Sequence, residues 1–535
     1  MKTTNQLKLA AAVAAGLALV GCGSSSDGGD DSIAKVFDCD AVTSVPRTIC
    51  IGSESDLSDS KIYTDLSTAL QSVQSGDTII LPAGRYEMEG GFDFNGLDSI
   101  VGLTIKGAGM DKTILDFDGT SEDSFHITNM DDLIMEDLGV YESANNAIKT
   151  KDVDGVILRR VATVWETDYS PGNGAYGLYP VLSENILVED CYVKGSADAG
   201  VYVGQSQNIV VRGCTAEKNV AGIEIENSIN ADVYNNIAIG NTGGILVFNL
   251  PIAENTRYTK NVRVFDNLVE SNNAPNFAVA GSNPAGVHIV PPGTGIILLA
   301  AQDVEVFNNT IKNNETMAMA VTSFFLPDGD VDNYGTEYGS ILASGWNPLM
   351  KSVNIHSNTI SQEKYLPQAG ALEDMQQIVL GYALKGGIPD IFYDGVGELL
   401  ANAGELVPFA QDEGLNASPY FNPKEFLPYD YANDGDDKSD AICISENGSA
   451  TMGSVTRVDP MAEDAWELDS ENNPTGPKYV LTTDTPEIFT CGGESGKDIP
   501  TAASKAVVTF DDNTSFSCGV DDAATAPDAC ITVEI

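Results

Sequence analysis

Residues 186–191 (ILVEDC), 209–214 (IVVRGC) and 231–236 (ADVYNN) carry the pattern that decides the fold. Each segment places apolar residues on alternate positions, and the three starts lie 23 and 22 residues apart. A strand this short cannot bury its apolar face alone, so a repeat of this period predicts coils that stack on one another. The sequence therefore predicts a parallel β-helix, an all-β solenoid whose neighbouring strands lie about 4.8 Å apart.

The pattern continues on both sides of these three segments. Equivalent segments start at Leu133, Val156, Val262, Val304 and Val353. Where the step between two starts exceeds 23 residues, we interpret the excess as an insertion into a coil. A second strand precedes most of the segments by eight residues, with starts at Ile148, Leu178, Val201, Ile223 and Ile296.

The sixth position of each segment forms a column along the predicted stack. Its members are Leu138, Val161, Cys191, Cys214, Asn236, Asn267, Asn309 and Asn358. Asparagine tolerates the left-handed backbone of a tight turn, and its amide is expected to bond the next coil. For Cys191 and Cys214, two stacked thiols are favoured over a disulfide, because free cysteine is commonly buried.

The beginning of the predicted stack carries a second signature. Residues 76–86 (GDTIILPAGRY) and 103–109 (LTIKGAG) resemble the start of right-handed β-helix proteins of the pectate-lyase-like superfamily. Residues 59–366 resemble a bacterial lipoprotein family with a parallel β-helix domain, whose genes often accompany a c-type cytochrome. The resemblance implies a right-handed solenoid and a periplasmic c-type cytochrome as a partner, and it transfers no catalytic residue. A short helix at residues 64–73 is expected to cap the first coil.

The N-terminal residues have the features of an export signal. Two lysines precede an apolar run at residues 9–20, which is too short to span a bilayer. Residues 19–22 (LVGC) resemble a bacterial lipobox, which implies lipidation of Cys22 and an outer-membrane lipoprotein facing the periplasm or the cell surface. The expected organisation is a signal peptide at 1–21, a tether and N-terminal segment at 22–58, the β-helix at 59–366, a helical and loop connection at 367–429, and an acidic β-rich appendix at 430–535.

Charge and cysteine usage agree with export. With 28 basic and 78 acidic side chains the formal net charge is −50, which argues against nucleic acid or anionic lipid as partners. Besides Cys22, the chain has eight cysteines, an even number. In an oxidising compartment we expect disulfides at the two ends, involving Cys39, Cys50, Cys443, Cys491, Cys518 and Cys530.

The register of the second strand predicts two outward columns on one face. The first contains His126, Lys149, Tyr179, Tyr202, Glu224 and Leu246, and the second Thr128, Lys151, Val181, Gly204, Glu226 and Phe248. Insertions near residues 165–175 and 268–295 fall beside this face, and solenoid insertions often mark a binding face. Tyrosines and charges between two loops indicate a saccharide groove. The alternative is that exposed tyrosines simply suit a pleated surface.

Proton transfer next to a uronic carboxylate requires a base, an acid and a positive group. Lys149 is the candidate neutraliser or base, Tyr179 and Tyr202 are candidate acids, and His126 or His288 is a candidate base. Trp165, Asp168, Asp198, Glu224, Glu226 and His288 are the expected substrate-binding residues. The high negative charge opposes an acidic polysaccharide unless a cation bridges the two or the groove is locally basic.

Metal-binding patterns are weak in this sequence. Asp328, Asp330 and Asp332 resemble a calcium loop, but the glycine is misplaced for an EF-hand and no glutamate closes the loop. The three histidines lack ligand spacing, so zinc or copper enzymes and copper-site assembly are disfavoured. Calcium is the one candidate cofactor.

The sequence therefore predicts a lipid-anchored β-helix that binds a polysaccharide, with lyase or C5-epimerase chemistry as the candidate activity. The alternative is a non-enzymatic surface or scaffolding protein that holds a protein partner such as the cytochrome.

Overall fold

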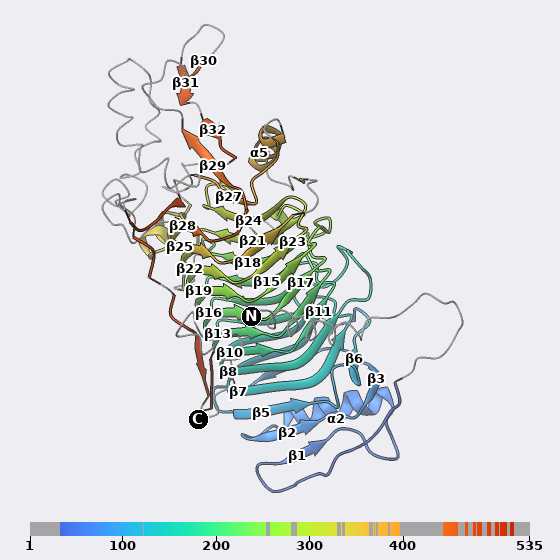
Figure 1. The fold of residues 1–535 in the computed structure, drawn as a ribbon. Coiled ribbons are helices and arrows are strands. Elements are labelled where there is room, and N and C mark those ends of the chain that lie inside the picture. Colours follow the sequence, from blue (N-terminus) through green and yellow to red (C-terminus); the bar gives the residue numbers. More distant parts are fainter. Residues whose placement is uncertain are drawn as a thin grey trace, which may run out of the picture.

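The computed structural model describes residues 33–120, 122–252, 257–279, 286–328, 333, 337–362, 367–368, 370, 373–383 and 386–395, and stretches at 442–457, 466–468, 474–477, 479–483, 489–493, 498–501, 503–510 and 514–517. Within these residues the chain winds as a stack of coils from β1 to β28 (Figure 1). Each coil contributes strands to three parallel sheets, named A, B and C here. Cys22, Asp330, Asp332, Cys518 and Cys530 lie outside the described residues.

Sheet A contains the segments that revealed the repeat. Its strands are β1 (Thr48–Cys50), β2 (Asp77–Ile80), β5 (Val101–Lys106), the middles of β7 (Asp123–Tyr141) and β8 (Asn146–Val164), β10 (Glu184–Glu189), β13 (Gln207–Arg212), β16 (Ile229–Tyr234), β19 (Lys260–Phe265), β22 (Gln302–Phe307), β25 (Lys351–His356) and β28 (Ile442–Ser445). The parallel pairing Ile186↔Ile209↔Ala231↔Val262 follows the predicted register.

Sheets B and C complete each coil. Sheet B consists of β3 (Gly84–Glu87), β6 (Thr113–Asp116), the ends of β7 and β8, β11 (Tyr192–Lys194), β14 (Thr215–Glu217), β17 (Ile237–Ile239), β20 (Leu268–Glu270), β23 (Thr310–Lys312) and β26 (Thr359–Ser361). Sheet C consists of β4 (Phe92–Asn95), the starts of β7 and β8, β9 (Leu178–Val181), β12 (Ala199–Gly204), β15 (Ala221–Glu226), β18 (Gly243–Phe248), β21 (Thr294–Leu299), β24 (Met317–Thr322), β27 (Ile391–Tyr393) and β29 (Met452–Arg457).

The inward residues of the three sheets form one apolar interior. Rows of Ile, Val and Leu side chains run the length of the stack, for example Ile148, Leu178, Val201, Ile223 and Ile245, all with no exposed surface. The helix α2 (Asp59–Gln71) caps the first coils with Ile62, Leu66 and Leu70 buried. The helix begins after Ser58, five residues before the predicted start, because Ile62 and Leu66 extend its apolar face toward the N-terminus.

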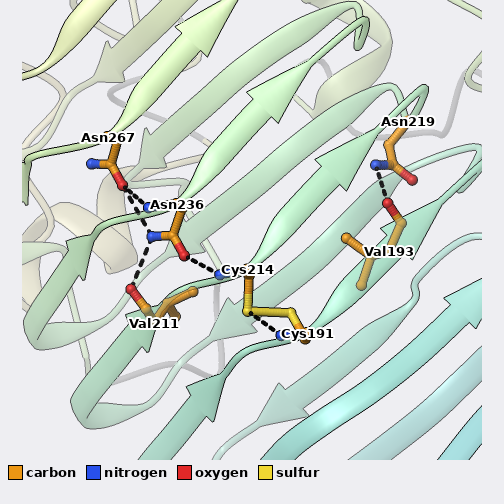
Figure 2. The surroundings of a disulfide bond; sticks show 7 residues. All are labelled: Cys191, Val193, Val211, Cys214, Asn219, Asn236 and Asn267. Atoms are coloured by element: carbon orange, nitrogen blue, oxygen red, sulfur yellow. Dashed lines mark hydrogen bonds between the residues drawn. A yellow bond between two sulfur atoms is a disulfide. The ribbon is translucent and has the colours of Figure 1, made fainter. Parts of the chain in front are cut away.

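The asparagine column between sheets A and B is confirmed. The side-chain amide of Asn236 donates to the backbone oxygen of Val211 and to Asn267 Oδ1, each at 3.0 Å (Figure 2). Asn267 repeats this arrangement with Asn309 on the next coil. A second column, which the sequence analysis missed, lies between sheets B and C and contains Asn219, Asn241, Asn272 and Asn314. These buried amides satisfy the backbone groups at the turns of each coil.

The expectation of two stacked thiols is wrong for Cys191 and Cys214, which form a disulfide between neighbouring coils (Figure 2). Their Cα atoms are 4.4 Å apart, because stacking at strand spacing brings consecutive positions of the column within reach of a bond. The disulfide Cys39–Cys50 is confirmed, and Cys443 pairs with Cys491.

The stack continues past residue 366, where the sequence periodicity fades. Strand β27 pairs with β24, and β28 pairs with β25, so residues 391–393 and 442–445 form further rungs. Beyond them β29 pairs antiparallel with β32 (Tyr479–Leu481), and β30 (Trp466–Leu468) pairs with β31 (Pro474–Pro477). Two segments beyond residue 366 are therefore built into the solenoid.

The last described segment returns along the outside of sheet A. Strands β33 (Val507–Thr509) and β34 (Ser515–Ser517) form a hairpin that lies over β10 and β13, shown in dark red beside the stack in Figure 1. Val508, Phe510 and Phe516 pack there against outward residues of sheet A, including Leu187 and Val210. Val210 is fully buried, although strand alternation alone predicts that it faces solvent.

Candidate functional site

The predicted outward columns of sheet C are confirmed by the strand register. His126 pairs with Lys149, Lys149 with Tyr179, and Tyr202 with Glu224 and then Leu246. Strands β9 and β12 pair through Leu178↔Val201, which places Tyr202 next to Tyr179 in the column. The second column likewise brings Gly204, Glu226 and Phe248 into line.

Only the first part of this face is accessible. We call the outward residues Asp93, His126, Lys149 and Tyr179 the open face; the side chain of Asp93 is 82% exposed, that of His126 31% and that of Lys149 24%. The column then continues as the covered face: Tyr202, Glu224, Leu246, Ile297, Ala320 and Phe392, none of which is more than 6% exposed.

Insertions between the coils cover the second part of the face. Apolar residues from these insertions, among them Leu250, Ile289, Leu342 and Met375, join the covered face in one apolar cluster. They come from the segments after β18, β20 and β24, which include η2 (Val287–Ile289) and α4 (Gly339–Ala343), and from α5 (Glu373–Ala383). The expectation that insertions collect on this face is correct, but most of them close it.

The loop between β8 and β9 borders the site and is held to the solenoid. Asp168 forms ion pairs with Lys194 at 3.1 Å and with Lys218 at 2.8 Å, so its carboxylate anchors the loop. Trp165 was expected in the groove, and this is wrong: the side chain is 2% exposed, and its indole nitrogen donates to the carbonyl of Ser143 at 2.7 Å. Its large apolar area fills the core at the corner where the loop begins.

Three tyrosines meet where the open face ends. Tyr176 comes from the end of the loop, whereas Tyr179 and Tyr202 come from β9 and β12; the ring centroids lie 4.4, 4.8 and 5.0 Å apart. Tyr176 and Tyr179 are partly exposed, but Tyr202 is 3% exposed, so the expectation of an accessible Tyr202 is wrong. The amine of Lys149 lies 5.3 Å from the ring centroid of Tyr179.

Three carboxyl groups lie beside the tyrosines. The hydroxyl of Tyr202 donates to Glu226 Oε1 at 3.0 Å, and Gln205 and Tyr176 lie close enough to Glu226 and Asp198, respectively, to favour their charged forms. Burial raises the pKa of Asp198 to about 8 and that of Glu226 to about 7, and it raises the pKa of Glu224 well above its usual value. These groups therefore hold protons near neutral pH, and the site carries less negative charge than its composition suggests.

Glu224 and Glu226 were expected to bind substrate directly. Glu224 is 1% exposed and Glu226 8%, so both lie beneath the accessible surface. One carboxyl oxygen of Glu224, Oε2, is buried with no hydrogen-bond partner. Asp198 keeps partial exposure and is the acid that a ligand on the open face can reach.

Gly204 shapes the inner part of the site. A Cβ atom at this position would collide with the ring and hydroxyl of Tyr202. The absence of a side chain lets the ring of Tyr202 lie along β12 and reach Glu226 on the next coil. The sequence placed Gly204 in the second column, but it did not indicate this contact.

The histidines lie apart from one another. His126 belongs to the open face, where its Nδ1 is 3.4 Å from Asp93 and its Nε2 is buried without a partner. His288 is the middle residue of η2, and the residues on either side of it, Val287 and Ile289, pack on the covered face. Burial lowers the pKa of His288. His356 lies on sheet A and bonds Glu305 at 3.0 Å.

Asp328, the first residue of the expected calcium loop, accepts hydrogen bonds from within its own segment. Asp328 accepts hydrogen bonds from the amide of Asn333 at 2.9 Å and from the hydroxyl of Tyr338 at 2.7 Å. Among the residues that the structure describes, no three His, Cys, Asp or Glu side chains are grouped so as to hold a metal ion. No helix in the described part of the chain is long and apolar enough to cross a membrane.

The arrangement supports binding and proton transfer. Tyrosine rings offer faces on which the apolar side of a sugar can stack, and Lys149 adds a positive charge beside them. Asp198 can donate a proton near neutral pH, and His126 lies one coil beyond Lys149. Tyr176 was missed because no column predicts it; the aromatic content of the loop was the one signal that could have indicated it.

Comparisons with known proteins agree with the architecture. Residues 123–371 match the family described as "Right handed beta helix region". Similar solved structures include the A-module of the mannuronan C-5 epimerase AlgE4 from Azotobacter vinelandii, at 16% identity and a TM-score of 0.37 over 65% of this chain and 89% of that one. The polygalacturonase from Erwinia carotovora ssp. carotovora is 11% identical, with a TM-score of 0.36 over 59% of this chain and 92% of the other.

A third similar structure is the pectate lyase Pel9A, with 14% identity and a TM-score of 0.31 over 57% of this chain and 72% of that protein. The chain matches no curated protein sequence. These likenesses are distant, with at most 16% identity.

Proposed function

Because residues 123–371 form a right-handed β-helix with an aromatic and cationic open face, we propose that the protein binds an acidic polysaccharide there. The observation that carries this proposal is the position of Lys149 beside the ring of Tyr179, where the open face meets the covered face. A lysine next to a stacking platform can pair with the carboxylate of a uronic unit while the ring contacts the sugar.

The net charge of −50 opposes a polyanionic ligand, but the local charge supports one. Asp123 lies 3.9 Å from the amine of Lys149 and offsets part of its charge. Burial raises the pKa of Asp198, Glu224 and Glu226, so these three acids carry less negative charge near neutral pH than their number suggests. Lys149 and Lys151 project from the same strand at alternate positions, so both lie on this side of the sheet. Screening by salt weakens repulsion from the more distant carboxylates, since the Debye length is about 8 Å at physiological ionic strength.

We propose that the chemistry at this site is proton transfer at the carbon next to the uronic carboxylate, as in a lyase or a C5-epimerase. Lys149 would neutralise the carboxylate and so lower the cost of charge that develops when the proton leaves. Tyr179 or His126 would accept or donate the proton, and Asp198 would supply a second proton from its protonated form. Tyr202, Glu224 and Glu226 would position Tyr179 and Tyr176 from below.

The test is turnover and binding with a panel of uronic polymers. Unsaturated chain ends, detected by ultraviolet absorbance, would identify a lyase, and solvent isotope exchange without absorbance would identify an epimerase. Tyr179→Ala should weaken binding about five- to thirtyfold, the loss of one stacked ring at about 1–2 kcal/mol. Tyr192→Ala is the matched control, since Tyr192 is a partly exposed outward tyrosine on sheet B.

Lys149→Ala should abolish turnover, whereas Lys312→Ala on sheet B should not, because Lys312 pairs with Glu270 on another side of the solenoid. If no uronic polymer binds, or if the Tyr179 and Lys149 variants behave as the parent does, the proposed function is wrong. A non-enzymatic surface role would then be the better interpretation.

We further propose that the protein is anchored by a lipid on Cys22 in the outer membrane. The support is the sequence at 19–22 (LVGC) and the glycine-, serine- and aspartate-rich composition of residues 23–31 (GSSSDGGDD) that follow. Metabolic labelling with a fatty acid should mark the parent protein, and Cys22→Ser should release it from the membrane fraction. Unlabelled parent protein in the soluble fraction would contradict the anchor.

A further inference from the structure

The geometry of the covered face limits how a polysaccharide can lie in the site. A groove that binds the interior of a chain must be open at both ends along the direction of the chain. The open face of this protein starts at Asp93, where the side chain is 82% exposed, and continues through His126 and Lys149. It covers the four coils of β4, β7, β8 and β9, so three strand spacings give a length of about 14 Å.

The other end of the face is covered by protein, which leaves an apolar cavity between Ile297, Ala320 and Phe392 of the covered face and Ile289 and Met375 of the cover. Ile297 is 5% exposed, Leu246 and Phe392 are fully buried, and the insertions over them contribute Ile289, Leu342 and Met375. The covering residues and the covered face belong to the same apolar cluster, which also includes the fully buried Leu349. A sugar chain that continued along the column would have to displace this cluster.

Hydrogen bonds hold the cover in place. The amide of Asn227 donates to the carbonyl of Leu250 at 2.8 Å, and the indole of Trp346 donates to the carbonyl of Asn249 at 3.0 Å. Arg257 donates to the backbone oxygen of Gln205 at 2.7 Å, which ties the first insertion to the turn after β12. These bonds are made by buried or partly buried groups, so opening the cover would leave polar atoms without partners.

Tyr176, Tyr202 and Asp198 form the wall at which the open face stops. The centroids of the first two rings are 4.8 Å apart, and the hydroxyl of Tyr176 lies near the carboxyl of Asp198. Tyr202 is held from behind by Glu226. The wall therefore offers a ring surface and a hydrogen-bonding carboxyl to whatever approaches it along the open face.

We infer that the site takes the end of an acidic polysaccharide chain, with the terminal unit against Tyr176 and Asp198, and does not take the interior of a chain. This inference rests on the proposed function. It adds that the ligand binds by one chain end and that only its first few units contact the protein. A terminal unit has a free hydroxyl where an interior unit continues, and Asp198 can bond such a hydroxyl. Contact is confined to a few units, because the open face is only about 14 Å long.

The experiment uses the purified protein and uronic oligosaccharides of increasing length, with binding measured by calorimetry per mole of chains. Affinity should rise over the first few units and then become constant. A bulky aromatic label on one end of the chain should weaken binding about tenfold or more, a loss of about 1.4 kcal/mol per factor of ten, while the same label on the other end should have little effect. Which end is sensitive identifies the end that meets the wall.

Two variants test the wall itself. In the Tyr176→Ala variant, the affinities for labelled and unlabelled chains should differ by no more than about threefold, because the ring that the label would clash with is gone. Asp198→Asn keeps the shape of the wall and should weaken binding of the unlabelled chain alone. Tyr192→Ala, on sheet B, is the control and should keep the full discrimination between labelled and unlabelled chains.

The outcomes separate the two proposals. Affinity that keeps rising in proportion to chain length, or binding that tolerates labels at both ends, would overturn the inference while leaving polysaccharide binding intact. Absence of binding at every length would overturn the proposed function and the inference together. Constant affinity with one sensitive end supports both.

Discussion

Tyr202 determines the inner geometry of the site although it does not reach the surface. Its ring contacts Tyr176 and Tyr179, and its hydroxyl bonds Glu226 at 3.0 Å. Because the side chain is 3% exposed, its removal opens a cavity beneath the open face. The side chain of Tyr202 therefore contributes both apolar packing and a hydrogen bond to the site.

This coupling predicts different costs for two substitutions. Tyr202→Ala should lower the free energy of unfolding by about 3–5 kcal/mol, as for other buried aromatic residues. Tyr202→Phe keeps the ring and loses one hydrogen bond, so we expect a loss of about 1–2 kcal/mol. Urea denaturation measures both. Equal, small losses of about 0.5 kcal/mol would mean that the ring is exposed in solution.

Glu226 predicts a pH dependence of stability. Its pKa in the folded protein is about 7, above the value of about 4.3 for an unfolded chain. The folded state therefore binds a proton that the unfolded state has lost, and this contribution to stability is present below about pH 4 and is lost as pH rises through 7. Thermal denaturation from pH 5 to 9 should show the parent losing stability more steeply than Glu226→Gln. Parallel curves would show that the carboxyl titrates normally.

At the scale of elements, each strand of sheet A between β1 and β28 is held by parallel neighbours on both sides. Strand β13 pairs with β10 and β16, and its residues Ile209 and Val211 point into the core. The loop between β8 and β9 has no such constraint at residues 171–173, where Pro171 and Gly172 are exposed.

One inserted residue should therefore have very different effects at the two places. An insertion between Ile209 and Val210 turns the following side chains to the wrong face and should lower the melting temperature strongly. An insertion between Pro171 and Gly172 should lower it only slightly. Differential scanning calorimetry compares the two, and equal decreases would show that the register is incorrect.

At the scale of the whole molecule, the C-terminal hairpin of β33 and β34 acts as a strap over sheet A. Val508 is fully buried in an apolar cluster with Leu187 and Val210, whereas its neighbour Val507 is 42% exposed. The strap also bonds the solenoid through the backbone amide of Ser504, which donates to Asn261 Oδ1 at 2.6 Å. A segment more than two hundred residues away in sequence thus covers an outward face of the repeat.

A charge under the strap should detach it. Val508→Asp would bury a carboxylate among apolar groups, and we expect a lower melting temperature and increased fluorescence of a hydrophobic dye. Val507→Asp is the matched control and should leave both unchanged. A dye response of equal size in the two variants would show that the strap does not cover sheet A in solution.

The sequence by itself determined the repeat, its coil length, the register of sheets A and C, and the asparagine column. The reason is that each coil carries its own alternation of apolar and polar residues, and stacking identical strands leaves one register that buries every apolar row. Lys149 and Tyr179 could be placed side by side for this reason, although they lie thirty residues apart.

Only the tertiary structure decided which outward residues are accessible. Some outward positions of the strands are buried, among them Tyr202, Glu224 and Val210. Insertions cover the first two, and the C-terminal strap covers Val210. Those contacts join segments that share no periodicity, so no local pattern encodes them. Burial in turn sets the pKa of Glu226 and closes one end of the open face, because the energy of a charge depends on its surroundings rather than on its place in the repeat.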